Sequence, residues 1–513
     1  MGLFDYDNTS IDSILKYTRE NLIGRSLYDI LEEFQNSEYK TYEDKKKGTP
    51  STTTRKEISE LSKGRYGNII EECFYGFKPN NSPEPDIPEA CLEIKTTPYK
   101  INKDKTISAK ERLVLSMINY NKENLDDFYE THLWKKCRQT LILFYKPEKN
   151  QSILHNTIDR FHLYTWPDED MPVIIEDYEK ITQKIKEGRA HEISESECTY
   201  LSACRKGAGK EKDFTSQPNS EMEARSRAWS LKPSYMTTLL RTIVFNENNQ
   251  QTTSLTTGDT TKSFTKIIEE RVLAYQGLTE AELCKMFGKK FIPGGRNGTK
   301  VRNIIINKII KLPPDNNDFI EFQKANIDKI RTIRIKKNGA VKESLSFKNY
   351  NFKDYSQEKD DEWETSHMYT EVFSKKFIFV IFKENSYGEF YLSHIKFWGF
   401  PDSLETEFQR VWRETRSIIN HGVKLTVNQS NEGNVTVSTN FPQSSVNNFI
   451  FTKIHADGSY YEIKPGQFVG NGKLADTDEL PDGRRITKHS FWLSTKFIRE
   501  IMADKWDHVA DSE

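Results

Sequence analysis

The two halves of this 513-residue chain contain similar short segments in the same order. The first pair is LIGRSLYDI, from Leu22, and LTEAELCKM, from Leu278. A single match of this kind could arise by chance, but an ordered series indicates an internal duplication, which restricts the chain to two copies of one fold. The later pairs are KGRYGNIIEE (63–72) with TKVRNIIINK (299–308), KKCRQTLILFYK (135–146) with KKFIFVIFK (375–383), FHLYTWPDED (161–170) with HIKFWGFPDS (394–403), and RAWSLKPSYMTTLL (227–240) with KHSFWLSTKFIREIM (488–502).

A polar segment separates the two copies. NENNQQTTSLTTGDTTK (246–262) lacks apolar periodicity and predicts a linker, which leaves one domain at 1–245 and another at 263–513. The runs TLILFYK and KFIFVIFK are apolar on both faces and predict central strands of a covered sheet. Amphipathic helices should flank these strands. One such helix is predicted after Pro167 and another after Pro401, and a glycine, Gly188 or Gly422, follows each proline at the same distance, beyond the helix. We expect a duplicated α/β fold.

Composition narrows the class of protein. Lys and Arg number 75 against 76 Asp and Glu, so DNA binding would need a local basic patch rather than a global charge, and KKKGTPSTTTRK (45–56) predicts one basic loop. No apolar stretch is long enough to span a membrane, and no secretory signal is evident at the start. The six scattered cysteines show no metal-binding spacing, which favours reduced thiols and a cytoplasmic protein.

The segment SPEPDIPEACLEIKTTPYK (82–100) holds the most informative charged residues. Its prolines keep the approach extended, and period two then places Glu93 and Lys95 on one strand face, opposite the apolar side chains. Asp86 precedes Glu93 by seven residues, so a turn can bring the two carboxylates together. Carboxylate oxygens suit Mg²⁺, and a metal-polarised water beside a lysine can attack a phosphodiester. By itself the same string also fits a surface ion pair.

Two further features favour a catalytic role. The preceding segment GRYGNIIEECFY can add a third carboxylate, from Glu71 or Glu72. In the second copy Ile306 stands in the place of Glu71, and the strand TIRIKK carries Arg334 and Lys336 in the places of Glu93 and Lys95. One copy is therefore equipped for a metal and the other is not.

Together these motifs resemble those of the MutH family of DNA endonucleases, and most closely its long, two-domain restriction enzymes of the Sau type. The resemblance rests on motifs in the family's order between Leu22 and Arg241, and the second half is similar to those enzymes too. It implies a mixed sheet flanked by helices, of the PD-(D/E)xK nuclease type, and Mg²⁺-dependent hydrolysis of double-stranded DNA at GATC, 5′ of G. The motifs are KGRYG, PD-x6-EIKTTP, SAKERLVLSMINY, THLWKK, YLSACRKGA and RAWSLKPSYMTTLLR.

The resemblance also assigns roles to residues. Asp86 and Glu93 would bind the metal, Lys95 would orient or activate the attacking water, and Glu71 (Glu72 in the other helix register) would assist. Lys136, in THLWKK, matches a further lysine near the family's active site. In YLSACRKGA the chain departs from the family, because Cys204 or Arg205 could occupy the position of the DNA-contacting arginine.

Other basic segments are predicted to contact DNA. The loop RKGAGKEK (205–212) combines glycines with basic side chains, including Arg205 and Lys206, that can follow a phosphate backbone. Ser230 and Lys232, in WSLKPSY, are predicted to open a helix and read base edges, and Lys63 and Gly64 to hold a phosphate at a helix start. In the second half, PGGRNGTKVR (293–302) offers similar chemistry, which favours DNA binding without cleavage.

A palindromic DNA site has two scissile bonds, one in each strand, whereas each chain is predicted to have only one catalytic site. We therefore expect the second half to bind a second DNA site as an effector, and the chain to be a monomer in solution that pairs on DNA. Two alternatives stay open. One is a MutH-like nicking repair endonuclease, and the other is a non-catalytic, sequence-specific DNA-binding protein on a nuclease fold.

Overall fold

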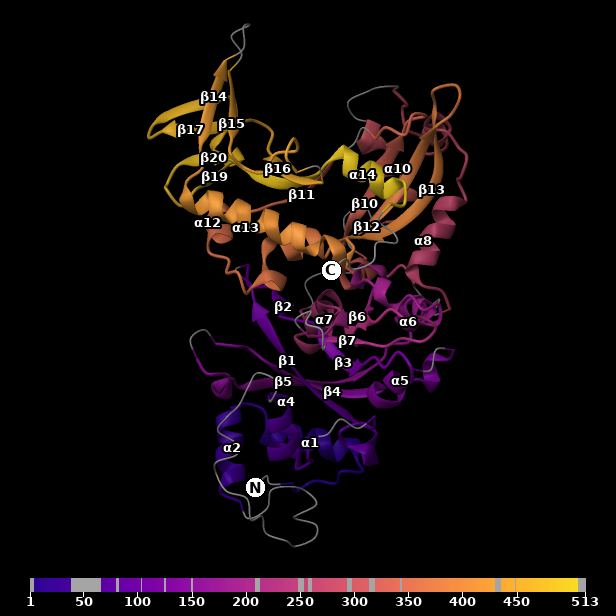
Figure 1. The fold of residues 1–513 in the computed structure, drawn as a ribbon, viewed down its shortest axis with the longest axis vertical. Coiled ribbons are helices and arrows are strands. Elements are labelled where there is room, and N and C mark those ends of the chain that lie inside the picture. Colours follow the sequence, from indigo (N-terminus) through magenta and orange to yellow (C-terminus); the bar gives the residue numbers. More distant parts are fainter. Residues whose placement is uncertain are drawn as a thin grey trace. The chain divides into compact units, whose positions relative to one another are not determined.

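The chain folds into two compact units. The first consists of Met1–Ile193, Cys198–Phe264 and Asp318–Ala325, and the second of Ser194–Glu197, Thr265–Asn317 and Asn326–Glu513. The structure is a computed structural model, shown in Figure 1. It describes residues 4–37, 66–79, 83–102, 104–123, 126–148, 151–207, 213–247, 253–256, 261–292, 298–312, 319–341, 344–429, 435–447 and 449–505.

The described part of the first unit contains two larger sheets and the short β7-β8 pair. One sheet has the order β2-β1-β4-β5, with β1 parallel to β4 and β5 antiparallel to β4. The other has the order β3-β9-β6, with antiparallel pairs. Its helices are α1 (Ile11–Asn21), α2 (Leu27–Gln35), α4 (Tyr66–Ile69), which continues as a π-helical turn (Ile70–Tyr75), α5 (His132–Cys137), α6 (Met171–Lys186), α7 (Pro233–Leu239) and α11 (Ile320–Ala325). Its strands are β1 (Glu93–Ile101), β2 (Ile107–Ala109), β3 (Leu113–Met117), β4 (Gln139–Tyr145), β5 (Ile158–Thr165), β6 (Leu201–Arg205), β7 (Phe214–Thr215), β8 (Ala224–Arg225) and β9 (Arg227–Leu231).

The second unit repeats this arrangement. Its sheet β10-β12-β13 corresponds to β1-β4-β5, because it likewise has a parallel pair followed by an antiparallel pair, and β11-β21-β16 is antiparallel throughout, like β3-β9-β6. Its helices are α8 (Phe264–Leu273), α9 (Glu280–Met286), α10 (Gly298–Ile309), α12 (Phe352–Ser356), α13 (Glu405–His421) and α14 (Thr495–Met502). Its strands are β10 (Ile327–Ile335), β11 (Leu345–Asn349), β12 (Lys376–Glu384), β13 (Phe390–Gly399), β14 (Leu425–Gln429), β15 (Val435–Thr439), β16 (Ile450–Ile454), β17 (Tyr460–Lys464), β18 (Gln467–Gly470), β19 (Thr477–Glu479), β20 (Arg485–Thr487) and β21 (His489–Leu493).

The common strand order confirms the predicted α/β class with mixed sheets and helices, and it agrees with the duplication. Gly188 and Gly422 follow α6 and α13, as predicted, and both have positive φ, which glycine adopts most readily. The first sequence pair, however, is displaced by three residues. Ser26 and Thr279 are the corresponding helix N-caps, each with a capping box. Three residues are nearly one helical turn, so either alignment keeps the apolar face in place.

The second unit also contains strands that the sequence comparison did not predict. The β14–β15 hairpin and the sheet β18-β17-β20-β19 lie between α13 and β21. In the corresponding interval of the first unit, from α6 to β9, the described residues form β6 and the short β7–β8 pair. The apolar side chains Tyr461, Leu480 and Ile486 of this region join the core of the second unit. The insertion is therefore packed as part of the unit.

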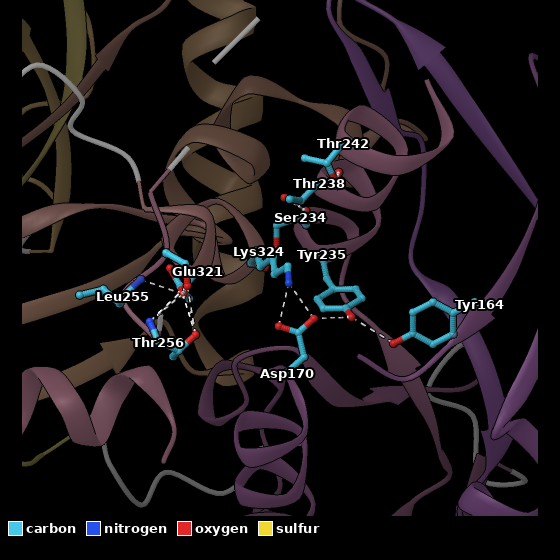
Figure 2. Close-up of polar contacts among 11 residues, drawn as sticks. Tyr164, Asp170, Ser234, Tyr235, Thr238, Thr242, Leu255, Thr256, Glu321 and Lys324 are labelled. Atoms are coloured by element: carbon cyan, nitrogen blue, oxygen red, sulfur yellow. Dashed lines mark hydrogen bonds and ion pairs between the residues drawn. The ribbon is translucent and has the colours of Figure 1, made fainter. Parts of the chain in front are cut away.

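The boundaries of the units differ from the predicted domains around α11. This helix follows the predicted linker in sequence, yet it packs with the first unit, as does the part of the linker that the structure describes at 253–256. Glu321 Oε1 accepts a hydrogen bond from Leu255 N at 3.0 Å (Figure 2). It also accepts one from Ser254 Oγ at 2.6 Å. The polar segment 246–262 is thus not a free linker throughout, because a buried carboxylate holds its backbone amides.

An ion pair fixes the other end of α11. Lys324 Nζ lies 2.7 Å from both carboxylate oxygens of Asp170, which directly precedes α6. Tyr235 donates a hydrogen bond to the same carboxylate at 2.8 Å, and its hydroxyl lies 3.0 Å from that of Tyr164 (Figure 2). All four side chains are buried or nearly so, so α11 is joined to α6, α7 and β5 by a buried polar network.

No helix among the described residues is long and apolar enough to cross a membrane. All six cysteines are free thiols, five of them buried, as the scattered spacing predicted.

Candidate active site

The spacing between Asp86 and Glu93 follows from a tight loop at the start of β1. Ile87 and Leu92 exchange backbone hydrogen bonds of 3.0 and 3.1 Å, and a short 3-10 turn, Pro88–Ala90, closes the loop between them. Cys91 completes it in the left-handed region, at φ 50°. Because Asp86 and Glu93 flank the bonded pair, their carboxylates are brought together at the end of the strand.

Backbone and side-chain hydrogen bonds hold the two carboxylates in this position. Asp86 Oδ2 accepts from Ile94 N at 2.9 Å, and Glu93 Oε2 accepts from Asp86 N at 3.2 Å. Leu92 and Ile94 lie in the core, as the alternation predicted. Glu93 itself is fully buried, at 0% exposure, so it is not the solvated surface charge that the alternative interpretation of the string requires.

Two lysines neutralise the buried Glu93. Lys95 Nζ donates a hydrogen bond to Glu93 Oε1, and Lys136 Nζ lies 3.4 Å from Glu93 Oε2. Burial alone would lower the pKa of Lys95, but the carboxylates of Glu93 and Asp86 outweigh burial and raise it, so the ammonium stays charged. For Glu93, burial raises the pKa, and the two lysines oppose that shift.

Helix α5 supports the same loop from the other side. Thr131 caps the helix by accepting from Trp134 N at 3.0 Å. Lys136 Nζ also donates to the Glu84 carbonyl at 2.9 Å, and His132 Nε2 lies 3.0 Å from the Pro83 carbonyl. His132 was not among the predicted site residues. Its spacing of four residues from Lys136 places both on one face of the helix, and this spacing is the signal that could have identified it.

Glu71 is the third carboxylate that the structure brings to the site. It lies on the π-helical turn Ile70–Tyr75, an irregularity that often occurs at functional sites. Burial, followed by the charge of Asp86, raises the pKa of Glu71 to about 7, and Lys95 acts in the opposite direction. Glu72 is not among the charges that act most strongly on Glu93 or Lys95. Because the charges of Asp86, Lys95 and Glu93 all act on Glu71, we favour Glu71 of the two carboxylates that the sequence leaves open.

This shift predicts how stability depends on pH when no metal is bound. A carboxyl group whose pKa is 4.5 when unfolded and about 7 when folded costs stability progressively as the pH rises between those values. The full cost is about 3 kcal/mol above pH 7. In EDTA we expect the thermal midpoint to fall as the pH rises through this range, and Glu71→Gln to remove much of the fall. Glu72→Gln is the matched control, and an equal effect of both substitutions would contradict the assignment.

The predicted DNA-contacting residues that the structure describes lie on or beside β6, β9 and α7, which are other elements than those that carry the three carboxylates. Arg205 ends β6 and Lys206 follows it, both half-buried, and the rest of that loop, 208–212, lies outside the described residues. Lys232 caps α7, and its Nζ donates to the Cys198 carbonyl at 2.5 Å. Lys63, Gly64 and the basic loop 45–56 also lie outside the described residues.

The prediction for Ser230 needs correction. It does not open a helix but lies within β9, fully buried, with its hydroxyl 3.1 Å from that of Ser202 on β6. The apolar residues on both sides, Trp229 and Leu231, continue the strand up to Lys232, where α7 begins. A hydroxyl in that position holds two strands together and is not presented to a base edge.

Comparison with known proteins identifies the family of the chain. The family model "DNA mismatch repair enzyme MutH" matches residues 75–177, a range that contains Asp86, Glu93, Lys95 and Lys136. The chain is also 30% identical over 473 residues to the "Type II restriction enzyme Sau3AI" of Staphylococcus aureus, with 87% of this chain and 94% of that enzyme covered. Since the similarity extends through both units, the chain belongs to the MutH-related, Sau-type restriction endonucleases, which are site-specific DNA-cleaving enzymes.

Proposed function

We propose that the first unit hydrolyses the phosphodiester bonds of double-stranded GATC sites, 5′ of G, and leaves a 5′ phosphate on a four-base overhang. The observation that carries this proposal is the convergence of Asp86, Glu93 and Lys95 at the start of β1. The GATC sequence rests on the family resemblance. An intact set of these residues disfavours a non-catalytic DNA-binding protein, and the duplicated second unit disfavours a small nicking repair enzyme.

The carboxylates fit a divalent cation such as Mg²⁺. No three His, Cys, Asp or Glu side chains in the described part of the chain form a complete metal-binding group. Mg²⁺, however, usually binds to one or two carboxylates and keeps waters and substrate phosphates as its other ligands. Burial is the main cause of the raised pKa values of Glu71 and Glu93, and the neighbouring charge of Asp86 raises both further, which a bound cation would offset. Asp86 and Glu93 would hold the ion, which would lower the pKa of a bound water.

The other side chains would act on the phosphate and the water. The charged Lys95 ammonium is positioned to orient or activate the water and to offset negative charge that develops on the phosphate. Lys136 would contribute a second positive charge while keeping the 83–86 loop in place. Glu71, with a pKa of about 7, can accept a proton near neutral pH.

Digestion of unmethylated plasmid tests this proposal. We expect cuts that depend on Mg²⁺, are abolished by EDTA, and map by end sequencing to the 5′ side of G in GATC. Cuts at another sequence would refute the GATC assignment and keep the catalytic site. Binding without any cleavage would favour the non-catalytic alternative, and nicks in one strand would favour the repair enzyme.

We further propose that the second unit binds a second DNA site, and that two chains pair on DNA to cut both strands. The support for this is a second unit whose strands β10-β12-β13 are paired as β1-β4-β5 are, while β10 carries basic residues where β1 carries Glu93 and Lys95. Plasmids with two sites should then be cut faster for each site than plasmids with one, with a reaction order in enzyme above one. Equal rates for each site together with first-order dependence would refute it.

A further inference from the structure

Strand register identifies which residues of the second unit stand at the positions of Glu93 and Lys95. In the first unit Gln139 pairs with Thr165, two residues before Pro167, and Lys95 lies opposite Ile142. In the second unit Lys376 pairs with Gly399, two residues before Pro401. Gln139 therefore corresponds to Lys376, and Ile142 to Phe379.

The residue opposite Phe379 is Arg331, which therefore takes the place of Lys95. Ile330 takes the place of Ile94. Lys329 directly precedes Ile330 and therefore takes the place of Glu93, although the strand pairing is irregular between Ile327 and Ile330. The sequence comparison had placed Arg334 and Lys336 there, five residues further along. The register therefore places two basic residues, Lys329 and Arg331, where the first unit has Glu93 and Lys95.

Arg331 keeps one hydrogen-bond donor unsatisfied, whereas Lys329 is exposed. Arg331 is mostly buried, at 13% exposure, and its Nη2 donates to Asp328 Oδ2 at 2.9 Å and to the Ser346 carbonyl at 3.1 Å. Its Nε is buried and has no hydrogen-bond partner among the residues that the structure describes. An unpaired buried N–H is costly, so this guanidinium would gain from an added acceptor.

The surroundings of the pair are positive. Repulsion from Arg331, together with burial, lowers the pKa of Lys329, and burial lowers that of Arg331. The carboxylate that opposes both is Asp328, which is 45% exposed. His455 follows β16, and its Nδ1 lies 3.1 Å from Ser490 Oγ. Burial lowers the pKa of His455, and the charges of Lys329 and Arg331 lower it further. Like charges crowded in this way favour an anion.

We propose that Lys329 and Arg331 bind a backbone phosphate of DNA directly, without a metal ion. This inference rests on the proposed binding of a second DNA site and names the group that the second unit would hold. In the first unit the carboxylates attract a cation, and the cation attracts the phosphate. In the second unit the chain itself supplies the cations, so the phosphate needs no metal, and no carboxylate pair is present on the strand to place one. Binding without cleavage follows.

The test uses the full-length chain carrying Glu93→Gln, a substitution chosen to prevent cleavage. Binding is measured in EDTA, so that no divalent metal ion is present. A fluorescent GATC duplex is titrated, and both the stoichiometry and the salt dependence of binding are recorded. We expect Lys329→Gln to weaken the binding of one of two duplexes about tenfold and to lower the slope of log K against log[salt] by about one. Arg331→Lys, which keeps the charge but loses the planar donor group, should have a smaller effect.

Lys336→Gln is the matched control, since Lys336 lies just after the end of the same strand and was the site favoured by sequence alone. A loss with Lys336→Gln but not with Lys329→Gln would overturn the register argument. Unchanged duplex binding in both variants would refute the phosphate site. A site that binds millimolar inorganic phosphate, while the Lys329→Gln substitution leaves duplex binding unchanged, would also refute it as a DNA site. Failure of the unsubstituted chain to cut DNA with Mg²⁺ would instead refute the proposed function. Unchanged thermal midpoints would show that the variants are folded.

Discussion

A Glu93→Gln variant is expected to lose DNA cleavage by a factor on the order of 10³ or more while it keeps its fold. Glu93 is the fully buried carboxylate that contacts Lys95 and Lys136 and accepts from Asp86 N. The amide has nearly the same shape but no charge, so it removes the charge that would bind a cation and hold the two ammonium groups in place. Single-turnover cleavage of a plasmid containing GATC measures the loss.

The matched control is Glu89→Gln, because Glu89 is an exposed carboxylate on the same short loop. It should cut at the rate of the unsubstituted chain. Unchanged thermal midpoints and DNA binding of Glu93→Gln in EDTA would show that the lesion is chemical. Cleavage that survives Glu93→Gln would show that the active site lies elsewhere.

A Lys324→Met variant is expected to destabilise the first unit by about 3–5 kcal/mol, the usual cost of removing one partner of a buried ion pair. Methionine keeps the length and apolar contacts of the side chain, but it leaves the Asp170 carboxylate buried with only the Tyr235 hydroxyl as its partner among the contacts drawn in Figure 2. Because α11 is held by this pair, the helix should detach first. Hydrogen exchange of the α11 and α7 amides, together with the thermal midpoint, measures both effects.

Lys186→Met provides the matched control. Lys186 Nζ lies 2.6 Å from Asp126, but both groups are well exposed, so this pair should contribute no more than about 1 kcal/mol. The double variant Asp170→Asn/Lys324→Met should recover part of the stability lost by Lys324→Met, since no unpaired charge then stays buried. Equal destabilisation by Lys186→Met and Lys324→Met would show that burial of the pair is not what matters.

Much of the site was evident from sequence because its chemistry is local. Asp86, Glu93 and Lys95 lie within ten residues, and a short loop and a strand with period two are enough to bring them together. Lys136 is distant in sequence, and its role followed from the family motif. The identity of the third carboxylate was left open between Glu71 and Glu72, because a π-helical turn changes which side chains share a face.

The predictions that rested on alignment without strand pairing were less accurate. Ser230 was placed at a helix start, but it is buried in β9. Arg334 and Lys336 were matched to Glu93 and Lys95, whereas the pairing with β12 selects Lys329 and Arg331. In a strand of alternating basic and apolar residues, several registers have similar patterns, and only the hydrogen bonds to the neighbouring strand distinguish them.

By itself the sequence determined that the fold is duplicated, that it is α/β, and that one copy has a nuclease-like set of charged residues, because each of these depends on residue types at short, regular spacings. Only the tertiary structure decided that Glu93 is buried between two lysines, that α11 packs with the first unit, and which basic residues replace the carboxylate site in the second. These depend on strand register and on partners far apart in the chain, such as Asp170 and Lys324, and local patterns do not encode them.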